Sequence, residues 1–491
     1  MSVEVFLSFL RNPLIRPMIR SSISPKNRRN YLESALNVLV GNKTSYSLNE
    51  IIFSRIIGLV LNLGFLAFDI DKKDAINSLK IPYFRNGLFN VLDSIGKYGV
   101  NKPLVLSAPF LVVWNYTNAC NLKCKHCYQS ADKPSPDELT TEESFRIVDQ
   151  LSESKVSAIA FSGGEPLIRE DLFRVARYAH DRGLYVSIAT NGTLLTDNVV
   201  EELKQSRVDY IEISLDSSRE ENHDTFRGVR GAFKRTMEGI KNAVEKGFYT
   251  CIAITATKNN INEIPDMIDI AKKIGIKRVI VFNFIPTGRG KEIEDLDLSP
   301  IEREDLLKYL YMELVEGRIE VLSTAPQYSR VCLQQSIATR RGFLAPTHFA
   351  ALDLHGRTKR LADFIGGCGA GRLYCAIQPN GQVTPCVFMP IVVGDLRKQS
   401  LREVWLNSGV MNDLRDRKRL KGRCRNCKYR DLCGGCRARA YAYYGDYLAP
   451  DPGCIRELEE PSTQFSIISA KPSITVSSSR NPNLKDNIFS M

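Results

Sequence analysis

The sequence predicts an α/β fold built on a partial (β/α)6 TIM-type barrel. Short runs of apolar and β-branched residues recur along the middle of the chain, and amphipathic stretches of helical period separate most of them. This alternation predicts a parallel sheet covered by helices. The predicted strands are 110–116, 157–161, 184–189, 209–214, 250–257 and 278–284, and the predicted helices are 141–153, 170–182, 197–206, 231–247 and 262–273.

The first predicted strand is followed by three cysteines at C-x3-C-x2-C spacing, namely Cys120, Cys124 and Cys127. Thiolates are soft ligands that suit zinc and iron–sulfur clusters. A closed zinc site needs a fourth ligand, whereas a [4Fe–4S] cluster held by three cysteines leaves one iron open to a substrate or cofactor. The spacing favours the cluster and leaves part of a zinc site as the alternative.

Four further motifs follow the predicted strands. They are Ser162-Gly163-Gly164-Glu165-Pro166, Thr190-Asn191-Gly192-Thr193, Ile213-Ser214-Leu215-Asp216-Ser217 and Phe284-Ile285-Pro286-Thr287-Gly288. Each motif falls at the C-terminal end of a strand, and the active sites of (β/α) barrels gather at that rim. A glycine pair alone is typical of an ordinary turn. Four motifs on strand ends instead predict one shared site.

With these motifs, residues 108–290 resemble the radical S-adenosylmethionine (SAM) superfamily. The resemblance implies that the three cysteines hold a [4Fe–4S] cluster whose open iron binds SAM. It implies reductive cleavage of SAM to a 5′-deoxyadenosyl radical that abstracts hydrogen from an unactivated C–H bond. The SAM contacts that it implies are Gly163, Gly164, Glu165 and Pro166 at the methionine amino group, Thr190 and Asn191 near the cofactor, Ser214 and Asp216 at the ribose, and Ile285 and His126 near the adenine.

Eight more cysteines, gathered toward the C-terminus, resemble a SPASM domain, which carries auxiliary [4Fe–4S] clusters. Two residues separate Cys433 from Cys436, where the family usually has three. A pair of zinc sites is the alternative. The ligand sets that the resemblance implies are Cys368, Cys375, Cys386 and Cys436 for one cluster, and Cys424, Cys427, Cys433 and Cys454 for the other.

Two of the 13 cysteines remain outside these groups. Cys251 lies on a predicted apolar strand and is interpreted as a packed core thiol. Cys332 lies in a polar connection and is the candidate catalytic donor of a hydrogen atom or proton. Cysteines clustered at metal-ligand spacings indicate a reducing cytoplasm and not a disulfide scaffold.

The motifs divide the 491 residues into five parts. The net charge of +12 would suit nucleic acid. However, Lys and Arg are spread along the chain without a basic–aromatic motif, so no clear nucleic-acid partner is expected. The predicted parts are a helical, basic and apolar extension at 1–105, the barrel at 106–290, a connection at 291–367, the Fe–S cluster domain at 368–455 and a disordered polar tail at 456–491.

Residues 1–30 combine six basic residues with a large apolar surface. A basic amphipathic segment of this kind can lie in a membrane interface. It can also be a helical cap packed on the barrel, and the two interpretations do not exclude each other. A second apolar stretch, 56–68, is expected to be too short to span a bilayer. No secretory signal is convincing. The expected location is therefore cytoplasmic, peripheral on the inner face of the cell membrane.

A membrane-facing extension favours an apolar substrate. The preferred hypothesis is a radical SAM enzyme that modifies the head group of an archaeal tetraether lipid, as calditol synthase does. The run 436–449 resembles the haem-biosynthesis decarboxylases and deacetylases, and a tetrapyrrole substrate is therefore the second hypothesis. A peptide-modifying maturase and a non-enzymatic Fe–S electron carrier or scaffold are also open. The expected partner is a low-potential electron donor such as ferredoxin or flavodoxin.

Overall fold

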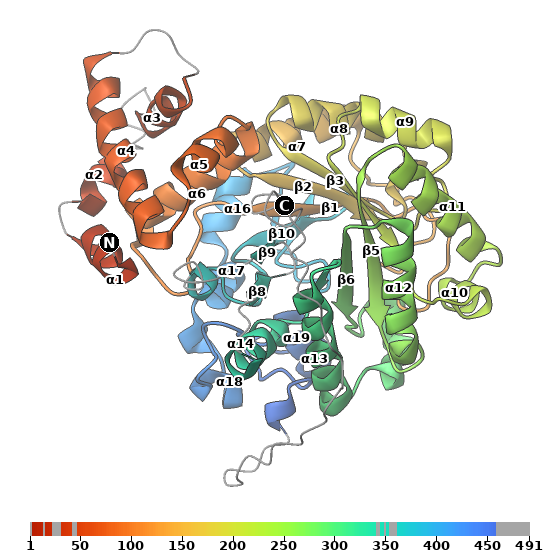
Figure 1. The fold of residues 1–491 in the computed structure, drawn as a ribbon. Helices are drawn as coiled ribbons and strands as arrows, with labels where there is room; N and C mark the ends of the chain where they lie inside the picture. Colours follow the sequence, from red (N-terminus) through yellow and green to blue (C-terminus); the bar gives the residue numbers. More distant parts are fainter. Residues whose placement is uncertain are drawn as a thin grey trace.

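A curved, mostly parallel sheet forms the centre of the protein (Figure 1). The computed structural model describes residues 2–12, 15–21, 31–41, 47–339, 344–347, 350–352 and 361–457. Within these ranges the main sheet has ten strands in the order β12-β11-β10-β1-β2-β3-β4-β5-β6-β7. Strands β1 to β7 run parallel in chain order, and helices cover the outside of the curve. The predicted α/β class and partial barrel are confirmed.

The barrel strands begin and end within two residues of the predicted positions for β1 to β6. Strand β7 falls in the stretch predicted to be a connection. It has four residues, which is too short to show a periodic pattern, and it pairs with β6 through Arg278↔Glu320. The strands are β1 (Leu111–Thr117), β2 (Ala158–Gly163), β3 (Tyr185–Thr190), β4 (Tyr210–Ser214), β5 (Tyr249–Ala256), β6 (Arg278–Asn283) and β7 (Glu320–Ser323).

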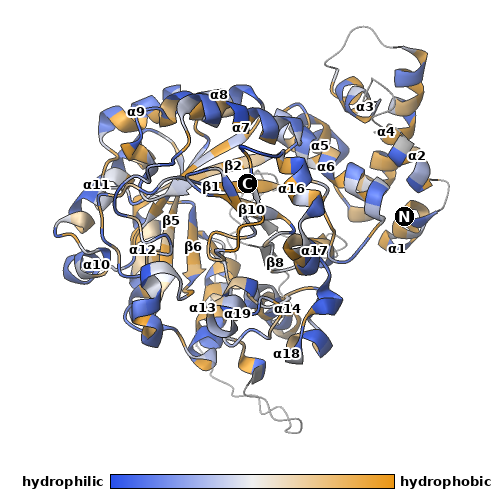
Figure 2. Ribbon diagram, turned by 180° about the vertical axis from the view of Figure 1, so that it is seen from behind, coloured by the Kyte–Doolittle hydropathy of each residue, from blue (hydrophilic) through white to orange (hydrophobic). Residues whose placement is uncertain are grey.

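The outer helices are amphipathic, and several begin with a capping box, as at Thr140 with Glu143 and at Ser299 with Glu302. Their apolar sides pack on outward-facing strand residues such as Trp114. Figure 2 shows apolar strands beneath helices whose outer sides are hydrophilic. These helices are α7 (Thr141–Glu153), α8 (Leu172–Asp181), α9 (Asp197–Gln205), α10 (Glu220–Arg227), α11 (Ala232–Glu245), α12 (Ile264–Ile274), α13 (Pro300–Glu316) and α14 (Gln327–Thr339), with short 3-10 turns at Pro166–Ile168, Ile261–Glu263 and Gly288–Leu296.

The C-terminal domain extends the barrel's own sheet. Strand β10 (Tyr374–Ile377) pairs with β1 in parallel, and β11 (Gln382–Thr384) and β12 (Gly394–Asp395) follow it antiparallel. The cluster domain therefore begins at the edge of the barrel. Its other elements, and those that precede it, are β8 (Leu344–Thr347), β9 (Ala350–Leu352), α15 (Leu361–Ile365), α16 (Leu401–Asn407), α17 (Gly409–Arg415), α18 (Gly422–Asn426) and α19 (Arg437–Tyr444), with 3-10 turns at Arg417–Arg419 and Ile455–Glu457.

The N-terminal extension is a group of helices beside the barrel (Figure 1). Apolar residues of the first two helices, including Phe6, Leu10 and Ile19, are buried against α4 and α6. Their apolar residues are therefore packed within the helical extension, as in a cap. The helices are α1 (Val3–Arg11), α2 (Ile15–Ser21), α3 (Tyr31–Leu39), α4 (Leu48–Phe68), α5 (Lys72–Ser78) and α6 (Pro82–Tyr98).

Helix α4 is longer than the apolar stretch suggested. Gly58 and Gly64 lie inside it without breaking it, and the Phe6 ring packs so closely on Gly64 that an added Cβ would lie 3.2 Å from the ring. With 21 residues it is the one helix in the described ranges whose length and apolar composition would allow it to cross a membrane, and 39% of its most apolar part is buried in the protein. The expectation that this stretch is too short to span a bilayer is therefore wrong, because the helix that contains it has 21 residues.

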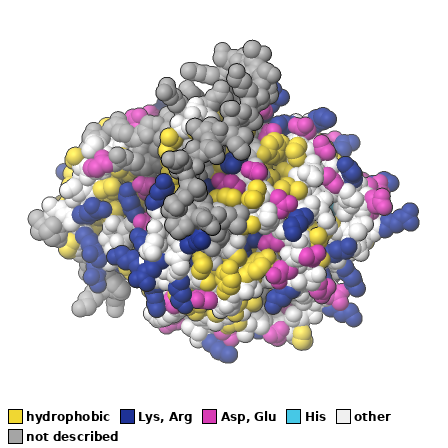
Figure 3. Space-filling model, turned by 90° about the horizontal axis from the view of Figure 1, so that it is seen from below, with side chains coloured by type: hydrophobic (Ala, Val, Ile, Leu, Met, Phe, Trp, Pro, Cys, Tyr) yellow, Lys and Arg dark blue, Asp and Glu magenta, His cyan; other side chains and the backbone are white. Residues whose placement is uncertain are grey.

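The basic residues do not form a block on the face seen in Figure 3, where Lys and Arg intermingle with Asp and Glu over much of the surface. This agrees with the spread of charge along the sequence. Most of the predicted tail, residues 458–491, lies outside the described residues.

Candidate active site

A cavity of about 330 Å³ lies inside the curved sheet. It runs from Arg278, at the start of β6, to the loops beyond the strand ends. Small inward-facing residues such as Ala160 and Ala253 leave this space open. The predicted site residues that line it are Cys120, Cys124, His126, Cys127, Gly163, Gly164, Thr190, Asn191, Ser214, Ile285, Cys368, Cys386 and Cys436.

The first three cysteines lie in the loop after β1 and gather around Leu122 and Ala232. In the described part of the chain, no three His, Cys, Asp or Glu side chains converge closely enough to ligate a single metal ion. One zinc ion needs every thiolate about 2.3 Å from a single point. A four-iron cluster binds each thiolate to a different iron and keeps the sulfurs further apart. The three thiols of this loop are the donor set of a four-iron cluster that leaves one iron open.

The glycine pair brings the end of β2 against the start of the cysteine loop. The Gly164 and Glu165 amides donate to the carbonyls of Thr117 and Ala119 at 2.7 and 2.8 Å. A Cβ on Gly164 would lie 2.0 Å from the Ala119 carbonyl oxygen, so no side chain fits there. Gly163 has φ +120°, a region that favours glycine. This leaves a bare backbone edge on the cavity, which fits the close approach of SAM.

Glu165 lies behind this edge and does not line the cavity. Its carboxylate is fully buried and accepts hydrogen bonds from the Thr190 hydroxyl and the Asn191 amide, both at 2.8 Å. Burial raises the pKa of Glu165 to about 7. Glu165 thus ties the end of β2 to the end of β3 and positions Thr190 and Asn191. Pro166 begins the next turn and is also buried away from the cavity.

Asp216 is likewise buried and does not line the cavity. It accepts from the Thr255 amide at 2.7 Å and forms an ion pair with Arg227 at 2.5 Å. The Arg227 guanidinium also donates to the Cys124 sulfur at 3.7 Å. Arg227 lines the cavity and brings a positive charge to the cysteine loop. Sequence reasoning missed Arg227, because it ends a short polar helix outside every motif.

His126 directly precedes the third cysteine of the loop. Its ring stacks on Phe226 with centroids 4.3 Å apart and an interplanar angle of 13°. Burial lowers the pKa of His126 to about 4, so the imidazole is neutral. A neutral flat ring that lines the cavity suits stacking on a second aromatic group.

The C-terminal cysteines divide differently from the implied ligand sets. Cys368, Cys386 and Cys436 line the cavity, and the Tyr374 hydroxyl donates to the Cys386 sulfur at 2.8 Å. Cys375 does not join them, because its pairing with Val112 turns it to the opposite face of the sheet, into the main core. Alternation along β10 thus places Tyr374, and not Cys375, among the three thiols.

The second implied set comes together around the turn at Gly434 and Gly435. Burial, with the nearby Cys454 and Cys424 thiols, raises the pKa of the Cys433 thiol. Burial and Cys427, among other neighbours, raise the pKa of Cys424. Cys424, Cys433 and Cys454 are therefore close to one another, and Cys427 lies near Cys424.

The two remaining cysteines lie in the core. Cys251 is buried on β5, as expected. Cys332 lies on α14, fully buried beside Tyr328, and does not line the cavity. The expectation that Cys332 stands in a polar connection is wrong, because α14 packs this part of the chain onto the barrel. The position does not support a role as donor to a substrate.

Comparison with known proteins agrees with these features. Residues 114–271 match the Radical SAM superfamily, and residues 368–428 match SPASM, an iron-sulfur cluster-binding domain. The chain is 39% identical over 351 residues to the AdoMet-dependent heme synthase of Methanosarcina barkeri, covering 71% of this chain and 97% of that protein. It is 30% identical over 374 residues to the mycofactocin maturase MftC of Mycolicibacterium smegmatis, covering 75% and 88%.

The fold is similar to that of Streptococcus suis SuiB bound to S-adenosylmethionine. The TM-score is 0.63 at 17% sequence identity, over 86% of this chain and 92% of SuiB. At that identity the likeness concerns the fold alone.

Replacing Gly164 with Ala tests the bare backbone edge. The new methyl group would meet the Ala119 carbonyl and force the strand end to shift, at a cost of roughly 1–3 kcal/mol. We expect at least a tenfold weaker affinity for SAM, measured by equilibrium dialysis under anaerobic conditions. Gly409→Ala is the matched control, since a Cβ there meets no atom within 4 Å. Equal SAM affinities in the two variants would contradict the role of this backbone edge in SAM binding.

Replacing Asp216 with Asn tests the buried ion pair. The change leaves the Arg227 charge without its partner, which costs about 3–5 kcal/mol for a buried pair. We expect a lower melting temperature and a lower iron content after reconstitution. Asp197→Asn breaks an exposed pair with Lys246 and should cost about 0–1 kcal/mol. A melting temperature that is equally unaffected in both variants would show that the buried pair does not support the site.

Proposed function

The chain belongs to the radical SAM superfamily, and we propose that it acts on a carboxylate side chain of an iron tetrapyrrole, in the manner of a haem synthase. Its cofactors are SAM and [4Fe–4S] clusters, as the two matched domains indicate. The observation that supports radical chemistry beside an auxiliary cluster is one cavity lined by both the first cysteine group and three C-terminal cysteines, while the substrate class is inferred from the relatives.

The cysteine loop would hold the cluster that binds SAM. Cys120, Cys124 and Cys127 supply the thiolates, and the glycine edge with Asn191 and Ser214 lies beside them. When bound, reductively cleaved SAM supplies a 5′-deoxyadenosyl radical that removes a hydrogen atom from a C–H bond. The protein's part is to hold the substrate carbon in reach and to exclude water.

The C-terminal cysteines would hold auxiliary clusters. We propose Cys368, Cys386 and Cys436 for the one beside the cavity, with Cys375 left out because it faces the core. Cys424, Cys427, Cys433 and Cys454 would hold the second. A cluster at the cavity wall supplies one-electron redox chemistry next to the substrate.

The substrate class is taken from the relatives. The tetraether-lipid hypothesis finds no support among them, and the N-terminal apolar face on which it depended is packed inside the protein. The tetrapyrrole hypothesis is favoured by 39% identity over nearly the whole length of a haem synthase. Peptide maturation is the second candidate because of the likeness to MftC.

The proposed reaction class is oxidative decarboxylation. A propionate side chain that becomes a vinyl group loses one hydrogen atom, one CO2 and one electron. The hydrogen atom goes to the 5′-deoxyadenosyl radical. The electron needs a one-electron acceptor, the role for which an auxiliary cluster is suited.

The test uses anaerobically reconstituted protein with SAM, dithionite and Fe-coproporphyrin III, an iron tetrapyrrole with four propionates. We expect vinyl products, detected by liquid chromatography and mass spectrometry. Each converted propionic acid group should lower the mass by one CO2 and two hydrogens, and one or two groups should be converted. One 5′-deoxyadenosine should form for each group converted. Formation of 5′-deoxyadenosine without altered tetrapyrrole would contradict the substrate class. Modification of a peptide in the same preparation would favour the maturase candidate.

The ligand sets predict iron content. The wild-type protein should hold about twelve irons in three clusters, and the variant with Cys120, Cys124 and Cys127 replaced by Ala should lose about four, together with SAM cleavage. Cys386→Ala should also lose about four irons, whereas its matched control Cys375→Ala should keep all twelve. Loss of four irons from Cys375→Ala would make Cys375 a ligand after all.

A further inference from the structure

Basic residues are spread along the chain as a whole, but one short run concentrates them. Residues 416–431 hold eight basic side chains against two acidic ones. The run includes the 3-10 turn Arg417–Arg419 and helix α18, which Figure 1 shows at the outer side of the C-terminal domain. We call the exposed basic residues of this run the basic surface; they are Lys418, Arg419, Lys421, Arg423, Arg425 and Lys428.

Half of these charges have no counterion. Within the described ranges, Lys418, Arg425 and Lys428 form no ion pair. Exposed like charges repel one another, and an anionic partner would relieve that repulsion. The remaining positive charge therefore fits an acidic partner. The carboxylates that are paired at this surface are Asp413 with Arg419, Asp446 with Lys421 and, beside them, Asp431 with Arg430.

The basic surface borders two cysteines of the proposed second auxiliary set. Cys424 and Cys427 are half-buried, and Arg423, Arg425 and Lys428 are their immediate neighbours in the chain. Consecutive Cα atoms lie 3.8 Å apart, so these basic residues lie beside the two thiols. The second thiol group is therefore reached from solvent at a positively charged part of the protein surface.

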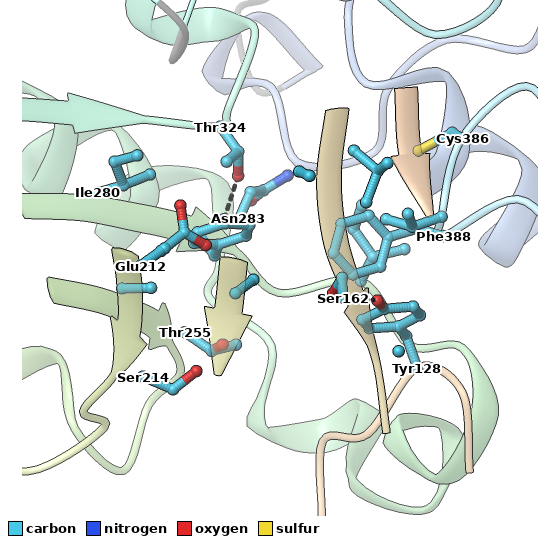
Figure 4. A pocket seen from close by; sticks show the side chains of 18 of the residues that line it. Tyr128, Ser162, Glu212, Ser214, Thr255, Ile280, Asn283, Thr324, Cys386 and Phe388 are labelled. Carbon is cyan, nitrogen blue, oxygen red and sulfur yellow. Dashed lines mark hydrogen bonds between the residues drawn. The ribbon is translucent and has the colours of Figure 1, made fainter. Parts of the chain in front are cut away.

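The same thiol group adjoins the cysteines that line the cavity. The Cys368 amide donates to the Cys433 carbonyl at 3.1 Å, and Cys433 begins the short turn that ends in Cys436. Cys386 belongs to the cavity wall, and Figure 4 shows it across the cavity from Ser214. One proposed cluster therefore faces the cavity, and its neighbour reaches the protein surface.

Building on the auxiliary clusters of the proposed function, we infer that the basic surface is the docking site of a small acidic protein that carries one electron. The proposed decarboxylation releases one electron, and the oxidised carrier takes it up, so the electrons balance. Complexes of this kind bury little area and are brought together by complementary charge. A nucleic acid would also meet the charge, but it gives no reason for the charge to lie beside redox-active thiols.

The experiment measures the affinity of anaerobic holoenzyme for an immobilised plant-type [2Fe–2S] ferredoxin, an acidic one-electron carrier, by biolayer interferometry. The wild type should bind at low salt. Raising the salt from about 0.02 to 0.5 M should weaken binding about tenfold or more, because mobile ions screen exposed charges. At low salt, the double variant Arg425→Glu/Lys428→Glu should raise Kd about tenfold or more, because it turns attraction into repulsion.

The double variant Lys72→Glu/Lys73→Glu on α5 is the matched control. It makes the same change in net charge at exposed positions of the N-terminal extension, in the first turn of a helix, where acidic side chains are favourable. It should bind ferredoxin as the wild type does. Iron content and melting temperature show whether each variant keeps its clusters and its fold. Should Arg425→Glu/Lys428→Glu lose iron, Lys418→Glu tests the basic surface away from the two cysteines.

A second measurement shows whether the docked carrier exchanges electrons with the auxiliary clusters. The variant with Cys120, Cys124 and Cys127 replaced by Ala removes the first cluster and should keep about eight irons. Rapid-freeze electron paramagnetic resonance follows one-electron exchange between this protein and ferredoxin at low salt. Adding Arg425→Glu and Lys428→Glu should slow the exchange about tenfold or more, because docking is weaker.

The outcomes separate this inference from the proposed function. An equal loss of affinity in the α5 variant would show an effect of net charge alone and overturn the docking site. Binding without electron exchange would overturn the electron carrier as the partner, and so would binding of a single-stranded RNA oligonucleotide in place of ferredoxin. Absence of binding by a wild type that holds about twelve irons would overturn the docking site alone. Docking and exchange as expected, without altered tetrapyrrole, would support the docking site and overturn the haem-synthase reaction.

Discussion

The parallel pairing of β10 with β1 is the constraint on which the candidate site depends. It joins the C-terminal domain to the barrel as one sheet, with Leu111 opposite Tyr374 and Val112 opposite Cys375. Because side chains alternate along a strand, this register turns Tyr374 toward the cavity and Cys375 toward the core. A shift of one residue would exchange them. The register therefore sets which thiols can reach a cluster at the cavity wall.

Buried charges hold the two domains together beside this sheet. Asp297 lies between Arg303 of α13 and Arg439 of α19, and both arginines also donate to Asn283 at the end of β6. Asp451 accepts from the Cys436 amide at 2.6 Å. Groups this deeply buried are tolerated only when they are paired, and removing one partner is costly. The network thus fixes Cys436 and the side-chain oxygen of Asn283.

The N-terminal helices contribute to the same architecture. Asn90 of α6 donates to the Ala108 carbonyl at 2.8 Å, and its oxygen accepts from the Ala108 amide at 3.2 Å, just before β1 begins. The Tyr83 ring lies against Tyr185 at the start of β3, at 5.2 Å between centroids. The extension therefore packs against the ends of the strands opposite the cysteine loop. Apolar residues of α1 and α2 such as Phe6 and Ile19 are used in packing within the extension, whereas α4 leaves Leu48, Leu59 and Leu66 exposed.

The sequence by itself determined the cysteine loop, the glycine edge and the first six barrel strands, because these depend on local spacing and periodicity. It did not locate β7, whose four residues carry no periodic signal. Only the tertiary structure decided that Glu165 and Asp216 lie behind the cavity wall, that Arg227 reaches Cys124, and that Cys332 is part of the core. The tertiary structure also decided that Cys375 faces the core. Which face a strand residue presents follows from pairing with segments far away in the chain, and burial follows from what packs against it. Neither property can be read from neighbouring residues.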